Sequence, residues 1–396
     1  MCRILAEFRG RSNGDRIDRM SYVYTTSLFI VLAFVVGFAQ CFKDPIQCWA
    51  PAEFTDSMVS YTKNYCWVQN TFYVPMFDQI PGNISESQDA QISYYQWVPL
   101  ILLFMAILFQ LPNVIWRILK GRSGTDLDNA VQFAQESQLG SREDQEKSIK
   151  SLAYFIDKWL IDNNKKTGIA KQIASKYLVV LYLFVKILYV LNAIGQLVLL
   201  SAFLSTYFNF YGFEFLENFS SNKPWRESSR FPRVILCDFQ LRQLHNVQVF
   251  TVQCVLPFNL FNEKIFIGIW FWLFFIAILA IFNLCKWFKP IMLTFNKTQF
   301  CKQYLQLNNA FHSSYDKKRC AQFAESYMSE DGVFVLRVIA INSTDLVVTD
   351  LVKKLWKLYT NKQSTTKNDE NFEFNMFKLV GNSDDDIKKP QNNEHL

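Results

Sequence analysis

Four cysteines in two separate segments are the residues of this chain best suited to covalent chemistry. Cys48 and Cys66 follow one long apolar run, and Cys237 and Cys254 precede another. Thiols in an oxidising compartment form disulfides, so the two segments are expected to build one cross-linked cap. Four cysteines allow three pairings, and their spacing does not choose among them. A rigid cap of this kind favours docking or recognition over catalysis.

Residues suited to catalysis or metal binding are scarce. The three histidines, His245, His312 and His395, do not lie in a metal-ligand spacing such as HExxH. The loop 117–176 has neither cysteine nor histidine, so it lacks the pair that a membrane acyltransferase needs. The string GRSGTD at Gly121 lacks the spacing and the lysine of a phosphate-binding loop. The sequence therefore predicts no enzyme, no catalytic residue, no metal and no cofactor.

Four apolar segments are long enough to cross a bilayer, which takes about 20 residues. The chain is 50% hydrophobic and 16% aromatic, with 38 Phe, a composition that suits contact with membrane lipids. A net charge of +6, without zinc-type cysteine spacing, gives no reason to expect a nucleic-acid partner. The predicted spans are 21–41, 97–116, 177–203 and 265–285.

The distribution of lysine and arginine sets the orientation of these spans. The terminal and middle segments carry 32 of them in 191 residues, whereas the two cysteine-bearing loops carry 8 in 116. Positive charge concentrates on the cytoplasmic side, so both termini are expected in the cytoplasm and the cysteines outside. The predicted cytoplasmic segments are 1–20, 117–176 and 286–396, and the predicted outer loops are 42–96 and 204–264.

Short elements are predicted within the outer loops. Pro51 suits the first turn of a helix, and Val59, Thr62 and Cys66 would share one face of that helix. The strings RFPRVILCDFQL and VQVFTVQCV read as strands joined by a turn at Arg242–Asn246, which predicts a β-hairpin.

Two asparagines in the outer loops begin sequons for N-glycosylation, and each is a candidate site. They are Asn83 and Asn218.

Three residues inside the predicted spans have structural consequences. Lys186 lies in the third span, where an ammonium facing lipid costs several kcal/mol, so it is expected to face protein or the pore. Pro99 and Pro112 lie in the second span. Each removes a backbone donor and is a candidate kink, either as packing or as a gating hinge.

The cytoplasmic segments are predicted to be helical. Ile149, Leu152, Ala153, Ile156 and Leu160 recur at helical spacing, so one face of that segment can pack. A helical domain is expected over 286–360, followed by a disordered tail over 361–396, where Lys, Asn, Asp and Glu dominate. Residues 1–20 are either a flexible leader or a short helix folded back along the first span.

The string YYQWVP, which contains Tyr94, Tyr95, Gln96, Trp97 and Pro99, resembles the signature of the innexins, the gap-junction proteins of invertebrates. Five more segments resemble this family and follow in the family's order. The connexins of vertebrates instead carry three cysteines per outer loop. The other matching segments are Gly14–Thr26, Asp44–Phe54, Phe231–Phe239, Val252–Trp272 and Ser329–Phe334.

The resemblance implies a mostly α membrane protein. The chain would be a four-transmembrane-helix bundle subunit of a large-pore channel, with a small disulfide-stapled α/β extracellular cap and a helical cytoplasmic domain. It also implies that two bridges join the outer loops, Cys48–Cys254 and Cys66–Cys237.

In function, the resemblance implies a homo-oligomeric ring, an octamer, in the plasma membrane. It docks with a ring of the adjacent cell, homotypic or heterotypic, and passes ions and small molecules between the cytoplasms. The family's N-terminus folds into the pore, and the pore-lining candidates are Ile4, Leu5, Phe8, Arg9 and Arg11.

Two other functions fit the same topology. A non-junctional large-pore hemichannel would open to the extracellular space without docking, and sugars at the outer sequons would favour it. A four-span adhesion or scaffold protein would have no conductance.

Overall fold

The structure, a computed structural model, divides into two compact units. The bundle unit contains 14–117 and 183–286, and the helical unit contains 118–182 and 287–396. The described residues are 15–69, 71–75, 92, 94–124, 126–138, 141–165, 168, 173, 175–204, 220, 231–243, 245–292, 295–307 and 314–363.

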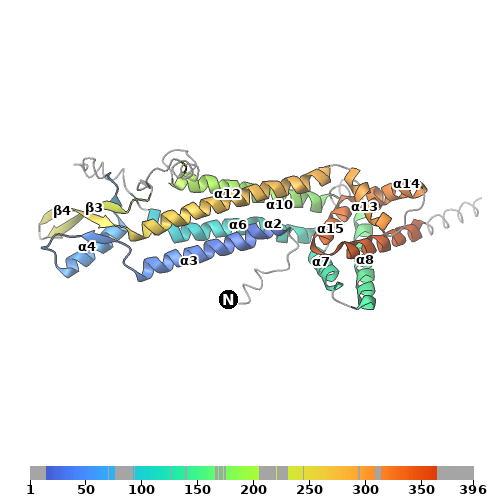
Figure 1. The fold of residues 1–396 in the computed structure, drawn as a ribbon, viewed down its shortest axis with the longest axis horizontal. Helices are drawn as coiled ribbons and strands as arrows, with labels where there is room; N and C mark the ends of the chain where they lie inside the picture. Colours follow the sequence, from blue (N-terminus) through green and yellow to red (C-terminus); the bar gives the residue numbers. More distant parts are fainter. Residues whose placement is uncertain are drawn as a thin grey trace, which may run out of the picture. The chain divides into compact units, whose positions relative to one another are not determined.

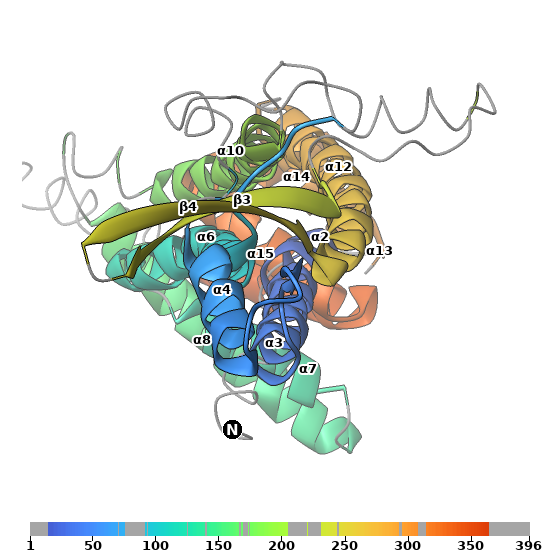
Figure 2. The same cartoon turned by 90° about the vertical axis from the view of Figure 1, so that its left-hand side faces the viewer.

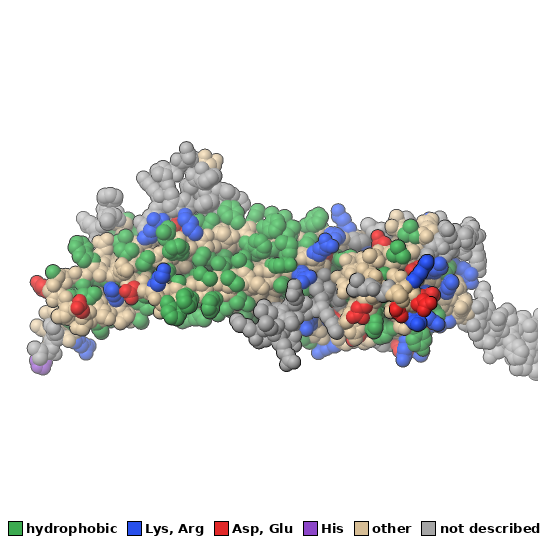
Figure 3. Space-filling model, turned by 60° about the horizontal axis from the view of Figure 1, so that its bottom comes forward, with side chains coloured by type: hydrophobic (Ala, Val, Ile, Leu, Met, Phe, Trp, Pro, Cys, Tyr) green, Lys and Arg blue, Asp and Glu red, His purple; other side chains and the backbone are tan. Residues whose placement is uncertain are grey.

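Four helices are long and apolar enough to cross a membrane, and this confirms the predicted fold class. Their membrane-spanning parts lie side by side in the bundle unit (Figure 1), and hydrophobic side chains cover much of the face of the bundle in Figure 3. The first helix runs through α2 (Arg16–Arg19), a π-helical segment η1 (Met20–Thr25) and α3 (Thr26–Phe42). The other three are α6 (Val98–Lys120), α10 (Tyr177–Leu204) and α12 (Pro257–Met292).

Two of these helices begin earlier than the predicted spans. The first begins at Arg16 rather than 21, because its first turns carry charged side chains that an apolar-run criterion excludes. The fourth begins at Pro257 rather than 265, since proline suits the first turn of a helix. Glu263 and Lys264 then interrupt the apolar run inside the helix.

The bundle core is aromatic and tightly packed. Phe29, Phe109, Phe266 and Trp270 are at most 1% exposed, and the rings of Phe29 and Phe109 meet edge to face at 5.8 Å. Such ring pairs contribute about 0.5–1.5 kcal/mol of stability beyond the contribution from burying their surface area. The first and second helices are therefore fixed against each other near mid-bundle.

A small cap follows the bundle at one end of the same unit. Its four antiparallel strands have the order β1-β4-β3-β2, and the helix α4 packs against β3 (Figure 2). The predicted hairpin is confirmed, with β3 continuing two residues into the predicted turn and β4 beginning at the last residue of that turn. The elements of the cap are β1 (Gln47–Trp49), α4 (Asp56–Val68), β2 (Thr71–Phe72), the 3-10 turn η2 (Tyr94–Gln96), β3 (Val234–Gln243) and β4 (Asn246–Val255).

The helix of the first outer loop begins later than predicted. Its N-cap is Thr55, and Pro51 lies before it in a turn. The Thr55 side chain makes no capping bond, but Asp56 in the first turn interacts favourably with the helix dipole, which suits a helix that begins here. Thr62 and Cys66 are buried on one face as expected.

Helices make up most of the described part of the helical unit. The predicted stripe on α8 is confirmed, because Ile149, Leu152, Ala153, Ile156 and Leu160 are all at most 3% exposed. The last helical segment continues to residue 363, three residues into the predicted disordered tail, and the rest of that tail lies outside the described residues. The segments are α7 (Leu127–Glu136), α8 (Arg142–Asn164), α13 (Phe295–Leu307), α14 continuing into the π-helical η4 (Ser314–Gln322 and Phe323–Tyr327), α15 (Ser329–Asn342), and 345–363.

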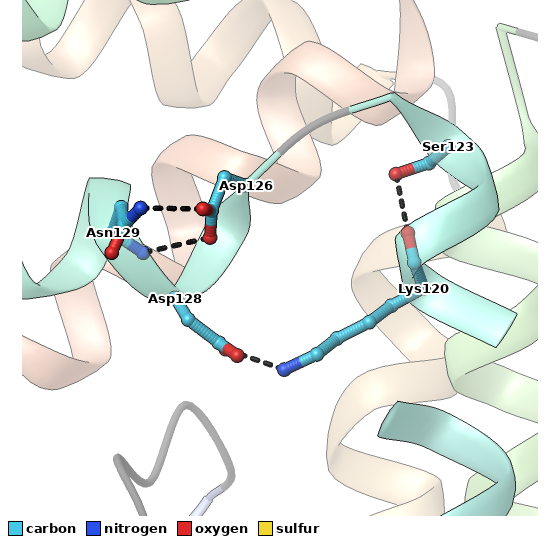
Figure 4. Close-up of polar contacts among 5 residues, drawn as sticks. All are labelled: Lys120, Ser123, Asp126, Asp128 and Asn129. Atoms are coloured by element: carbon cyan, nitrogen blue, oxygen red, sulfur yellow. Dashed lines mark hydrogen bonds and ion pairs between the residues drawn. The ribbon is translucent and has the colours of Figure 1, made fainter. Parts of the chain in front are cut away.

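The chain leaves α6 through a tightly bonded corner within the helical unit (Figure 4). The Ser123 hydroxyl donates to the Lys120 carbonyl at 2.7 Å, and Gly124 then takes a left-handed φ of 72°, which glycine adopts without strain. Asp126 caps the next helix by accepting from the Asn129 N–H at 3.1 Å, and Lys120 pairs with Asp128. These bonds fix where α6 ends and α7 begins.

Candidate functional site

Two disulfides join the two cysteine-bearing segments across the cap. Cys48 bonds Cys254 across 206 residues of chain, and Cys66 bonds Cys237 across 171. This is the pairing that the family resemblance implied. The sulfurs of Cys48, Cys66 and Cys254 lie within 4.8 Å of one another. Since all three are bonded in bridges, they offer no thiolate to a metal.

The strands of the cap place the cysteines for these bridges. Cys48 and Cys254 are directly opposite in the β1–β4 pairing, while Cys66 lies on the buried face of α4 above β3. Period-2 alternation turns the odd-numbered β3 residues toward α4, so Ile235, Cys237 and Phe239 are all buried there. The bridges thus close a core that the alternation had already formed.

Aromatic rings fill the rest of the cap core. Phe239 stacks on Phe250 at 5.5 Å, and Phe54 meets Phe250 edge to face at 5.3 Å. Phe54 precedes α4, whereas the other two lie on β3 and β4. The packing therefore joins both outer segments independently of the disulfides.

The YYQW string connects the cap to the bundle. The Tyr95 side chain is 2% exposed, and its hydroxyl lies 3.1 Å from the Thr71 Oγ1 on β2. Burial raises the pKa of Tyr95, so this hydroxyl stays neutral and acts through hydrogen bonds. The Gln40 Nε2 donates to the Tyr95 carbonyl at 2.9 Å, and Gln96 donates to the Trp67 carbonyl. The string therefore holds α3, α4 and β2 together.

The remaining signature residues differ in burial and role. Tyr94 packs on Phe231 with ring centroids 5.7 Å apart, and Trp97 is 56% exposed. Pro99 is the second residue of α6, so its missing N–H would have no helical partner in any case. Pro99 thus lies at the start of the helix and Pro112 inside it, and a kink of this span stays a prediction. Pro99 lies against Gly37 of α3: a Cβ added to Gly37 would be 3.6 Å from the Pro99 Cβ.

A buried ion pair lies within the bundle. Lys186 of α10 is 2% exposed, and its Nζ lies 2.5 Å from the Asp18 Oδ2. The Asn283 Nδ2 of α12 donates to the other Asp18 oxygen at 3.1 Å. Lys186 faces protein, one of the two positions that sequence reasoning allowed.

Sequence reasoning missed Asp18 as the partner of this lysine. The signal available was two carboxylates, Asp15 and Asp18, just before the first apolar run and one ammonium inside the third. Pairing them requires that the two helices be adjacent, which periodicity does not give. Beside the pair, the Trp272 Nε1 donates to the Thr25 Oγ1 at 3.0 Å, so the π-helical segment is also tied to α12.

Several predicted site residues lie outside the described part of the chain. They are the pore-lining candidates Ile4, Leu5, Phe8, Arg9 and Arg11, and the sequon asparagines Asn83 and Asn218.

Comparison with known proteins agrees with this geometry. The family model "Innexin" matches residues 14–359. Innexin unc-9 of Caenorhabditis elegans is 37% identical over 365 residues, which cover 90% of this chain and 94% of the relative. Innexin-11 of C. elegans is 34% identical, covering 88% and 79%, and Innexin-19 of Caenorhabditis briggsae is 31% identical, covering 89% and 88%. The four apolar helices and the cap with two inter-loop disulfides agree with these matches. The chain therefore belongs to the innexin family and is a gap-junction channel protein of the membrane.

Proposed function

We propose that this innexin forms a homo-octameric ring around an aqueous pore and docks through its cap with a ring of the adjacent cell. Ions and small molecules then diffuse between the two cytoplasms without a chemical step. The observation that carries this proposal is the cap, whose two disulfides and separate aromatic core make a rigid face at one end of the bundle. Rigid faces lose little entropy when they dock.

The proposed topology places both termini and the loop 117–176 in the cytoplasm. Disulfides persist in the oxidising space outside the cell, and both bridges lie in the loops with few basic residues. The free Cys301 and Cys320 lie in the proposed cytoplasmic domain, where thiols stay reduced. The proposed domain map keeps the segments of the sequence analysis, which end at residues 20, 41, 96, 116, 176, 203, 264, 285 and 360. The helix ends are those given above.

The pore is proposed to be lined by the N-terminal residues and the first span. On α3, Phe34, Phe38 and Val31 are more than half exposed in the single chain. Phe34 and Phe38 stack on each other at 6.1 Å, which gives this helix an apolar face. That face suits a neighbouring subunit or a weakly selective pore wall, and cysteine substitution with a water-soluble thiol reagent from the cytoplasmic side distinguishes the two.

Glycosylation separates the junctional function from the hemichannel alternative. Asn83 and Asn218 fall in the proposed docking loops, and a sugar there would obstruct a partner ring. A mass shift after glycosidase treatment at either residue, together with uncoupled cells, would favour the hemichannel.

The decisive experiment is dual whole-cell recording from paired cells that express this chain alone. We expect a junctional conductance that passes small dyes and disappears when one cell lacks the protein. Conductance in single cells without coupling in pairs would support the hemichannel, or a different partner chain. Absence of any conductance in correctly inserted protein would support the adhesion or scaffold alternative.

A further inference from the structure

A pocket opens in the cap between α4 and β3. Its volume is about 140 Å³, close to the roughly 150 Å³ of an engineered apolar cavity that binds benzene. Two hydroxyl side chains of α4 line part of it, and the other lining residues are large and mostly apolar: Phe54, Met58, Tyr61, Phe239 and Leu241. The size and the chemistry of this pocket suit one aromatic ring.

The same cap exposes one large aromatic side chain. Trp49 of β1 is 82% exposed, more than any other large apolar side chain among the described residues. Its strand is fixed in place, because the preceding residue, Cys48, is bridged to Cys254. Tryptophan is enriched at protein interfaces and is among the residues that contribute most to binding there. A tryptophan held rigidly in water is therefore suited to a protein partner.

Trp49 cannot enter the pocket of its own chain, because the two lie on opposite faces of the sheet. Val252 and Cys254 are buried on the α4 side of β4, so Gln253 between them faces away from α4. Trp49 lies opposite Gln253 in the β1–β4 pairing and points to that same outer face. Leu241 lines the pocket and so faces α4. A ring that fills the pocket must come from elsewhere.

Trp49 and the pocket also lie toward opposite ends of the hairpin. Leu241 is paired with Gln248 near the turn, whereas Trp49 is paired with Gln253 near the base. Five residues of strand separate the two positions, which is about 17 Å. Figure 2 shows the turn of the hairpin reaching past α4 on one side. A contact between the turn end of one copy and the base of another is head-to-tail, and such contacts repeat around closed rings.

Unpaired charges beside the two surfaces are opposite in sign. Asp56, in the first turn of α4 next to the pocket, is exposed, and so is Lys43, which precedes β1. Neither side chain forms an ion pair with another described residue. Asp44 is instead paired with Lys63 of its own chain at 3.6 Å. The pocket side is therefore acidic and the Trp49 side basic, which favours contact between two copies.

We propose that Trp49 of one subunit inserts into the α4–β3 pocket of the next subunit of the same ring. The inference rests on the proposed ring and names a contact that closes it outside the membrane. Each cap gives one tryptophan and receives one, so the contact repeats around the whole ring. Its effect is to hold neighbouring caps at a fixed spacing before a second ring docks.

Photo-cross-linking in isolated cells tests the contact without any docking partner. The photoreactive amino acid p-benzoylphenylalanine replaces Tyr61, which lines the pocket and is 49% exposed. After irradiation, denaturing gels should show a ladder that extends beyond the dimer, and mass spectrometry should place the attachment at Trp49 of another chain. A ladder that stops at the dimer, or attachment elsewhere on the cap, would overturn the proposal. The matched control carries the same amino acid at Val68, which is 65% exposed at the end of α4, and should not attach to Trp49.

A double-variant comparison gives a second, independent readout. Trp49→Ala removes the inserted ring, and Met58→Trp fills the pocket. Each should raise the dissociation constant of the purified ring at least about tenfold, and the double variant should lose no more than either single variant, because the contact is already absent. Val247→Ala, at a 53% exposed position near the turn, is the control and should leave the ring unchanged. Additive losses would contradict the proposal.

The outcomes separate this contact from the proposed junction. Coupled cells whose rings give no attachment at Trp49 would overturn the contact and leave the junctional function standing. Attachment at Trp49 in cells that never couple would support the contact and contradict docking alone. The cross-linking pattern of the Tyr61 variant decides between these outcomes even if Met58→Trp does not fold.

Discussion

The buried pair of Lys186 and Asp18 is the feature in which single residues matter most. Each charge is almost fully desolvated, and the attraction between them, with the Asn283 bond, offsets this cost. Removing one partner leaves the other charge buried without compensation, which costs about 3–5 kcal/mol.

Lys186→Met is therefore expected to destabilise the channel strongly, by about 3–5 kcal/mol, and Asp18→Asn in the same chain should restore most of that loss. The double variant keeps an oxygen for Asn283 and leaves neither position 18 nor position 186 charged. Lys286→Met is the control, because Lys286 is half-exposed and 3.9 Å from Asp15, so its pair is worth about 1 kcal/mol or less. The measurement is the apparent Tm and yield of the purified channel, and equal losses in single and double variants would contradict the argument.

Two glycines of the helical unit lie in different surroundings and test how closely its helices pack. In the helical unit, a Cβ at Gly332 would lie 3.0 Å from Leu160, whereas a Cβ at Gly121 would have no neighbour within 4 Å. Gly332→Ala should therefore force α15 from α8 and cost about 1–3 kcal/mol. Gly121→Ala should be near neutral, and thermal unfolding of the two variants side by side gives the comparison. A neutral Gly332→Ala would mean that Leu160 moves aside easily.

The elements themselves were largely predictable, and their pairings were not. Long charge-free runs gave the four spans, β-branched alternation gave the hairpin of β3 and β4, and the spacing of Ile149 to Leu160 gave the buried face of α8. These are local patterns, so physics within one segment decides them. Asp18 with Lys186 and Asp331 with α10 join residues 168 and 153 positions apart, and no local pattern ranks one such partner above another. The disulfide pairing came from family resemblance, since spacing allowed three possibilities.

At the scale of the whole molecule, the bundle unit has two separate hydrophobic cores. The core around Phe29 and Trp270 joins the spans, and the core around Phe239 and Cys254 fills the cap. Helices that cross a membrane satisfy their own backbone hydrogen bonds, so the bundle does not need the cap for insertion. The cap is small, and its order depends on cross-links between distant segments. Docking and pore formation are therefore expected to be separable by substitution.

Replacing Cys66 and Cys237 together by serine provides the separating variant. The loss of one bridge across 171 residues should cost the cap about 2–4 kcal/mol and bury two hydroxyls in an apolar core. We expect membrane insertion and single-cell conductance to persist, while junctional conductance between paired cells falls at least tenfold. Cys41→Ser with Cys285→Ser is the control, because both thiols are free and exposed, and it should leave both conductances unchanged. Coupling at the wild-type level in the bridge variant would show that docking does not use the rigid cap, and loss of insertion would show that cap and bundle fold as one unit.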